Sequence, residues 1–384
     1  MQGERHAPVR PSTVALRLLF AVMVASSLVA GLVGGLMRAG VAVPQALCGV
    51  WGSASVVGHA FLMICGFMGT VIGIERAVAV KSRFSLAAPI ASGLAGLLML
   101  TGHPEAARWL AVTAGIAFVG VNVLVVTRQR AAHTVLLLVA AATWLVGNLW
   151  FAAGAAPAAA LPWWFSFLVL TIAAERLEMT RLMRRREGAA QALYVILGAQ
   201  LLGCAATAVS DAWGGVLYGL SLTGLAVWLL CFDIARRTIK AEGLSRYMAL
   251  CLLLGYFWLG VAGMAWAATS LGQPLRDATF HALGLGFVFS MMLGHAPVIL
   301  PALARVKLLF GWLFYAPLAL LHASLVVRLV GGRIDFSLLA AGAAANAFSL
   351  LLFAATVAGS AIAWRMKHSP PSRSLHHGHH PATH

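Results

Sequence analysis

Twelve long apolar runs follow one another along this chain, with few charged residues inside them. A helix needs about 20 such residues to cross the hydrocarbon core of a bilayer, where backbone polar groups must be satisfied internally. The chain is 61% hydrophobic and only 10% charged, whereas ordinary soluble domains have about one quarter charged residues. The sequence therefore predicts an all-α, multi-pass membrane protein whose helices contact the lipid bilayer.

The apolar runs place the twelve spans at 14–37, 54–74, 84–101, 107–126, 133–154, 159–180, 190–209, 212–234, 247–269, 278–302, 308–331 and 337–364. We thus divide the chain into an N-terminal segment at 1–13, a twelve-helix transmembrane domain at 14–365 and a His-rich tail at 366–384. The length of the first apolar run favours a retained helix over a cleaved signal peptide. The tail is rich in Pro, Ser and His without apolar periodicity, so it is predicted to be disordered.

The basic residues determine the expected orientation. The net charge of +16 comes from Lys and Arg at the ends of the apolar runs rather than from one soluble face, so we expect no nucleic-acid partner. With a cytoplasmic N-terminus, 22 of these residues fall on the inner side and 5 on the outer side. Because basic residues are retained on the cytoplasmic side, both termini are predicted to be cytoplasmic.

Four histidines lie within the predicted spans: His59, His281, His295 and His322. Ionisable groups at membrane depth usually face the bundle interior and mark a functional site. A neutral imidazole can equally serve as interhelical packing, held by a hydrogen bond to a neighbouring helix. The sequence leaves both interpretations open for each histidine taken alone.

His59 and His281 are more informative as a pair. Both spans run from outside to inside, and each histidine comes early in its span, so their depths in the membrane match. Two neutral imidazoles at one depth can supply the two axial ligands of a haem iron. We therefore predict that His59 and His281 are cofactor-binding residues.

His295 and His322 are candidates for a second metal site. His295 follows His281 by 14 residues, which at about 100° per residue in a regular helix returns it to nearly the same face, roughly 21 Å deeper. His322 lies in the eleventh span, from which it can approach the tenth. Methionines and Cys65 near His59 raise copper as a further metal, although such residues are also ordinary apolar filler.

Three acidic residues stand out in the predicted spans. Glu75 and Glu175 each precede an arginine at the inner boundary, where they form either interface ion pairs or a proton entry point. Asp277 lies one helical turn before His281, so it can orient that imidazole. Polar residues recur on the second, sixth and tenth spans, which suggests three pseudo-repeated groups of four helices.

Two segments carry a family resemblance: GHAFLMICGFMGTVIGIERAVAV around His59 and FHALGLGFVFSMMLGHAPVILPALARV around His281. They resemble NnrS-type haem and copper membrane proteins, distant relatives of the heme-copper oxidase subunit I superfamily. The resemblance implies haem b on His59 and His281, a copper site, a bacterial inner-membrane location, and a role in nitric oxide metabolism or response or in membrane electron transfer. The oxidases' further histidines on helices six and seven, and their two closely spaced histidines on helix ten, are missing, so their binuclear site cannot be assembled.

A cofactor-free transporter is the alternative from a different class. In that interpretation the intramembrane His, Glu and Asp side chains line a path for a small solute or a proton. In the haem interpretation the partner is a small gaseous or redox ligand. Neither interpretation identifies a protein partner or establishes catalytic turnover.

Overall fold

The computed structural model describes residues 11–49, 51–180, 187–304 and 306–368. Within these ranges twelve helices are long and apolar enough to cross a membrane, and each overlaps one predicted span. The fold is all-α, as predicted. The predicted N-terminal segment lies almost entirely outside the described residues, and so does the tail from residue 369 onward, while the last helix continues to His368, past the predicted boundary at 365.

Several spans combine more than one element. The elements in chain order are α1 (Pro11–Arg38), α2 (Gln45–Cys48), α3 (Gly52–Phe61), η1 (Leu62–Gly69), α4 (Thr70–Val80), η2 (Arg83–Leu86), α5 (Ala87–Leu100), α6 (Pro104–Arg128), α7 (Ala132–Ala152), α8 (Pro157–Met179), α9 (Ala189–Ala206), α10 (Asp211–Phe232), α11 (Ala235–Thr238), α12 (Gly243–Ser270), α13 (Arg276–His281), η3 (Ala282–Phe289), α14 (Ser290–Ala304), η4 (Trp312–Phe314), α15 (Tyr315–Leu329), η5 (Gly331–Arg333) and α16 (Phe336–His368). The second span is α3–η1–α4, and the tenth is α13–η3–α14.

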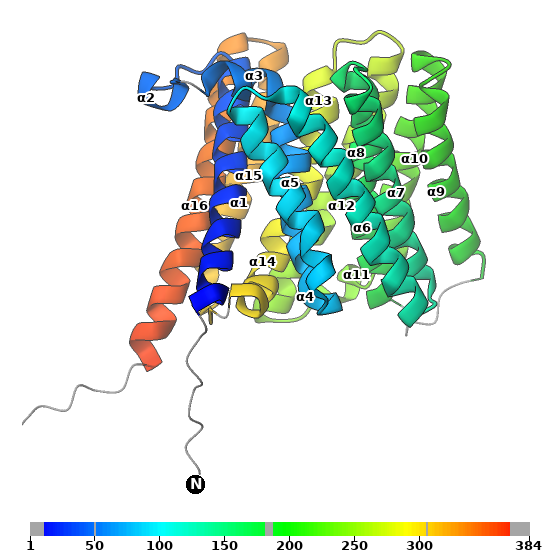
Figure 1. The fold of residues 1–384 in the computed structure, drawn as a ribbon. Coiled ribbons are helices and arrows are strands. Elements are labelled where there is room, and N and C mark those ends of the chain that lie inside the picture. The colour runs from blue at the N-terminus through cyan, green and yellow to red at the C-terminus, as the bar shows by residue number, and fades with distance from the viewer. Residues whose placement is uncertain (1–10, 50, 181–186, 305, 369–384) are drawn as a thin grey trace, which may run out of the picture.

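The helices form an up-and-down bundle in which most sequence neighbours pack side by side (Figure 1). The short connections leave little choice, because two helices joined by a few residues must lie antiparallel and adjacent. Helix α8 is the most enclosed span, with 78% of its apolar window buried. Helix α1 also contacts α16, which brings the two ends of the bundle sequence together.

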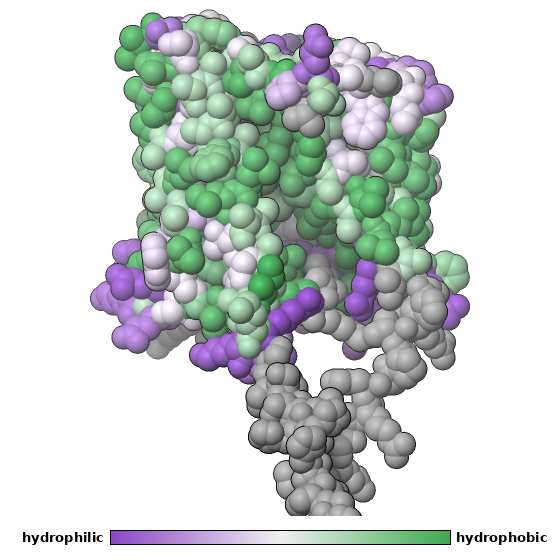
Figure 2. All heavy atoms as spheres, turned by 90° about the vertical axis from the view of Figure 1, so that its left-hand side faces the viewer, coloured by the Kyte–Doolittle hydropathy of each residue, from purple (hydrophilic) through white to green (hydrophobic). Residues whose placement is uncertain are grey.

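The surface has the layering expected of a membrane protein. Figure 2 shows a broad hydrophobic band between two ends where hydrophilic residues gather. The first turn of α1 and the last turn of α16 lie at the same end of the bundle (Figure 1), as an even number of spans requires. Bilayer contact therefore follows from the apolar outer surface of the helices.

Two spans contain π-helical segments, η1 and η3, of eight residues each. A π-helix bonds each N–H five residues back, and such segments are frequent at functional sites. His59 lies three residues before η1 and His281 directly before η3. Phe67 and Phe289 each follow their histidine by eight residues, and their rings stack with centroids 6.1 Å apart and planes at 14°. The second and tenth spans are thus built alike, whereas the sixth span, α8, is α-helical throughout.

The π-helical segment corrects one expectation. His281 and His295 were predicted to share a face because a regular α-helix advances about 100° per residue. Segment η3 lies between them and has a longer hydrogen-bonded repeat, so the regular advance does not apply. His281 accordingly contacts α15, whereas His295 contacts α8.

Candidate functional site

His59 is held against α1 by a hydrogen bond and by close backbone packing. Its Nδ1 lies 2.7 Å from the carbonyl oxygen of Gly31. A carbonyl only accepts, so Nδ1 carries the proton and donates it, and Nε2 keeps its lone pair. A side chain at Gly35 would place its first carbon 2.8 Å from the imidazole, so this face of α1 must remain bare.

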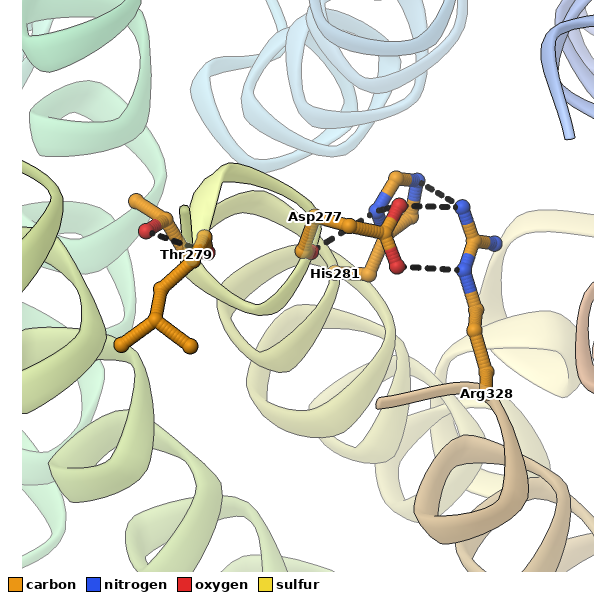
Figure 3. Close-up of polar contacts among 5 residues, drawn as sticks. Asp277, Thr279, His281 and Arg328 are labelled. Atoms are coloured by element: carbon orange, nitrogen blue, oxygen red, sulfur yellow. Dashed lines mark hydrogen bonds and ion pairs between the residues drawn. The ribbon is translucent and has the colours of Figure 1, made fainter. Parts of the chain in front are cut away.

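His281 has the same tautomer. Its Nδ1 lies 3.0 Å from the carbonyl oxygen of Asp277 and 2.9 Å from the carboxylate Oδ1 of the same residue. Nε2 accepts from Nη2 of Arg328 at 3.1 Å. Figure 3 shows the His281 imidazole and the Asp277 carboxylate side by side, each joined directly to the Arg328 guanidinium. The contact that the spacing of Asp277 and His281 predicts is therefore confirmed.

Arg328 closes the arrangement from α15. Its Nε donates to Oδ2 of Asp277 at 2.9 Å and its Nη2 donates to Oδ1 at 2.7 Å. Such a bidentate pair matches the planar fork of a guanidinium to a carboxylate. Arg328 is only 7% exposed, and both residues line a cavity of about 270 Å³ at this end of the bundle.

Replacement of Arg328 by lysine is expected to lower the free energy of unfolding by about 1–2 kcal/mol. A single ammonium cannot donate to both oxygens of the Asp277 carboxylate and to His281 at the same time, as the guanidinium does. Thermal unfolding of the purified protein in detergent measures the effect. Arg333→Lys is the matched control, since Arg333 is exposed and makes one bond of 3.5 Å to Pro274. Equal loss in the two variants would contradict a special role for Arg328.

The structure brings His59 and His281 together. Their ring centroids are 6.4 Å apart and their planes make an angle of 30°. Metal–imidazole bonds are about 2 Å long, and the coordinating nitrogen lies about 1.2 Å from its ring centroid, so two imidazoles on opposite sides of one metal have centroids roughly 6 Å apart. The observed separation of 6.4 Å is close to that value.

His295 and His322 lie elsewhere and differ from each other. His295 donates from Nδ1 to the Met291 carbonyl at 2.6 Å, and its Nε2 accepts from Arg176. His322 has the opposite tautomer, because its Nδ1 accepts from Nε1 of Trp258 at 2.8 Å. Its Nε2 faces Ser290 of α14 at 3.4 Å, so the expected approach to the tenth span is found. These hydrogen bonds give no support to metal binding by His295 or His322, which stays a prediction from the sequence.

The sulfur ligands considered for copper are engaged in packing. Cys65 is fully buried and its Sγ donates to Oδ1 of Asn148 at 3.4 Å. Met63 packs against Gly31 of α1. No group of three or more His, Cys, Asp or Glu side chains suited to a metal is found in the described residues. A two-histidine site falls below that count.

Among the residues that the structure describes, Glu75 and Glu175 do not form the ion pairs expected from the sequence. Within the described part of the chain, neither Glu75 nor Glu175 lies within 4.0 Å of a basic side-chain nitrogen. Arg76 and Arg176 nevertheless interact with them electrostatically at longer range. Of the two interpretations left open by the sequence, the interface ion pair is therefore not supported.

Fold and site define a multi-pass helical membrane protein with paired, oriented histidines near one end of the bundle. The chain belongs to a family described as a domain of unknown function, DUF8744, whose profile matches residues 17–362. No curated protein and no solved structure matches the chain.

Proposed function

We propose that this protein is a membrane haem protein in which His59 and His281 are the two axial ligands of haem b. The observation that carries the proposal is the 6.4 Å separation of the two imidazole centroids. The tautomers support it, since both histidines donate from Nδ1 to a carbonyl and keep the Nε2 lone pair. Metal-binding histidines are usually oriented in this way by their second nitrogen.

The surroundings of His281 bear on the fit of a flat macrocycle. Gly284 follows His281 by three residues, and a side-chain carbon built there meets nothing within 4 Å. The stacked rings of Phe67 and Phe289 form an apolar layer deeper in the same two spans. Arg328 occupies the Nε2 lone pair of His281, so it must turn away before that nitrogen binds a metal. The hydrogen bond from Arg328 Nε to the Asp277 carboxylate keeps the charge of the guanidinium compensated during this movement.

The bound haem would supply one-electron redox chemistry at its iron. Electron transfer suits an iron with two protein ligands, whereas binding of nitric oxide requires one histidine to leave. A role in nitric oxide metabolism or response, and a bacterial inner-membrane location, rest on the resemblance of the two histidine segments to NnrS-type proteins. Copper, with His295 and His322 as ligands, remains a hypothesis from the sequence.

The visible spectrum of the protein tests the proposal. Protein purified from haem-replete cells is expected to show a Soret band and, in the reduced state, the sharp α and β bands of an iron with two nitrogen ligands. A folded, monodisperse and colourless preparation from the same cells would contradict a haem function. Cells limited for haem synthesis give the apoprotein for comparison.

A cofactor-free transporter is the second candidate, favoured by polar groups at both ends of the bundle. Asp277 and Arg328 line the cavity at one end, and Glu75 of α4 and Glu175 of α8 lie near the opposite ends of their spans. Solute or proton flux into vesicles containing the colourless protein would favour this function over the first.

A further inference from the structure

The cavity beside Arg328 presents two arginines to whatever enters it. Its volume is about 270 Å³, and its wall comes from the segment before α13, the end of α15, η5 and the start of α16. Three of the lining residues are charged, namely Asp277, Arg328 and Arg333. Two positive charges and one negative charge give the wall a net charge of +1, so the cavity favours an anion.

Arg328 uses only two of its three guanidinium nitrogens within the protein. Its Nε and Nη2 donate to Asp277 and His281. Nη1 has no acceptor among the described residues, yet it is not a buried atom. Figure 3 shows this third nitrogen turned away from the carboxylate and the imidazole. Because Arg328 lines the cavity, its Nη1 is a donor available to a ligand there.

Arg333 supplies the second guanidinium. Its Nη1 makes a bond of 3.5 Å to the carbonyl oxygen of Pro274, which also lines the cavity. Among the described residues, no carboxylate oxygen lies within 4.0 Å of its nitrogens. The carboxylate of Asp335, two residues further on, accepts from the backbone N–H and the hydroxyl of Ser337 instead. The charge of Arg333 is therefore not compensated by an ion pair.

The segment that carries Arg333 is held in place by its own backbone and by α16. The backbone N–H of Ile334 donates to the carbonyl of Gly331 at 2.8 Å. A side-chain carbon at Gly332 would lie 2.8 Å from Cβ of Leu339, so η5 packs closely against α16. A binding group that is already ordered loses less entropy when a ligand binds. Arg333 is thus placed beside the end of α15 before any ligand arrives.

The carboxylate in the wall does not cancel this attraction. Both oxygens of Asp277 accept hydrogen bonds from Arg328, and Oδ1 also lies 2.9 Å from Nδ1 of His281. Its negative charge is therefore directed at these partners. Guanidinium groups bind phosphate and carboxylate oxygens by charge-assisted hydrogen bonds. The cavity is smaller than the roughly 300–1,000 Å³ of most pockets for drug-sized ligands, so it suits a small group.

The position of the cavity favours phosphate among the small anions. It lies where two spans end, at the depth of the phospholipid head groups. Ile334 and Phe336 beside it are 82% and 60% exposed, as side chains in contact with lipid can be. We propose that the cavity binds a phosphate group, with Nη1 of Arg328 and the guanidinium of Arg333 as donors. The site goes beyond the proposed function, because it does not require haem.

Phosphate binding is tested on the full-length, haem-free protein from haem-limited cells, purified in phosphate-free detergent buffer. Isothermal titration calorimetry with inorganic phosphate measures binding of the free ion. Native mass spectrometry with added phosphatidylglycerol measures binding of a lipid head group, and diacylglycerol with the same acyl chains is the phosphate-free control. We expect one phosphate group per chain in at least one of the two measurements, and no retained diacylglycerol. Binding in neither measurement would overturn the proposal.

Three variants locate the site. Arg333→Gln is expected to weaken binding at least about 10-fold while leaving the fold intact, because the side chain is exposed. Arg328→Lys is expected to weaken it similarly, since an ammonium that stays on Asp277 leaves no donor for the cavity. Arg108→Gln is the matched control, because Arg108 lies outside the cavity and pairs with Glu105 at 2.8 Å.

Unchanged binding in Arg333→Gln or in Arg328→Lys would overturn the two-arginine site. Equal weakening in Arg108→Gln would reduce the effect to general charge attraction and overturn it as well. Because the protein carries no haem in these measurements, failure of the haem assignment and failure of the phosphate site remain distinguishable.

Discussion

A protein with both His59 and His281 replaced by alanine is expected to lose its haem almost completely. A b-type haem is not covalently attached, so its retention depends on the iron–ligand bonds and on apolar packing. Even the loss of residues that only orient a metal ligand costs about 10–100-fold in affinity, and loss of both ligands costs more. The affinity for haem is therefore expected to fall more than about 100-fold, and the haem-to-protein ratio is expected to fall close to zero. Haem extraction and the Soret absorbance measure it.

The single variants and a histidine control make this experiment specific. Each single substitution is expected to leave one axial ligand and to shift the Soret band toward that of a five-coordinate iron. His322→Ala is expected to retain haem at the original ratio, because the His322 Nδ1 is bonded to Trp258 and its ring lies away from the pair. Retention of the unchanged spectrum in the double variant would exclude His59 and His281 as ligands.

The helices were predictable because the bilayer imposes a simple rule. A spanning helix must be long and apolar, so the run from 14 to 37 closely matches the described span Ala15–Arg38. The basic residues at the helix ends predicted that successive spans run in opposite directions through the membrane. Short connections then fixed which helices lie side by side. None of this depends on the details of side-chain packing.

Part of the candidate site was also predictable, by local geometry. Asp277 and His281 are one helical turn apart, so their contact follows from the helix alone. The similar depth of His59 and His281 followed from their positions in two parallel spans. Their separation of 6.4 Å did not, because depth says nothing about which helices are neighbours across the bundle.

Arg328 and the π-helical segments were not predictable. Arg328 is 51 residues from Asp277, so no spacing pointed to the pair. The π-helical backbone of η3 has no distinct apolar period, and it invalidated the assumed rotation between His281 and His295. Within the described residues, neither Glu75 nor Glu175 pairs with the arginine that follows it, because neighbours in sequence on a helix do not face each other.

Substitution of Gly34 by alanine is expected to have the largest effect on stability among single glycine changes near the histidine pair. The added carbon would overlap the backbone carbonyl of Ser55, where α1 crosses α3. Neither backbone can move without separating the two helices, so we expect a loss of about 3 kcal/mol in the free energy of unfolding. Thermal unfolding in detergent measures the loss.

Gly120→Ala distinguishes the crossing from a general effect of replacing glycine. Gly120 is an exposed helical position in α6, and a carbon added there meets nothing within 4 Å. Alanine is expected to be neutral or stabilising there by up to about 1 kcal/mol, because it favours the helix. Separation of α1 from α3 also weakens the bond between His59 and Gly31, which lies one helical turn before Gly34. The Gly34 variant is therefore expected to bind haem more weakly as well, whereas the Gly120 variant keeps it.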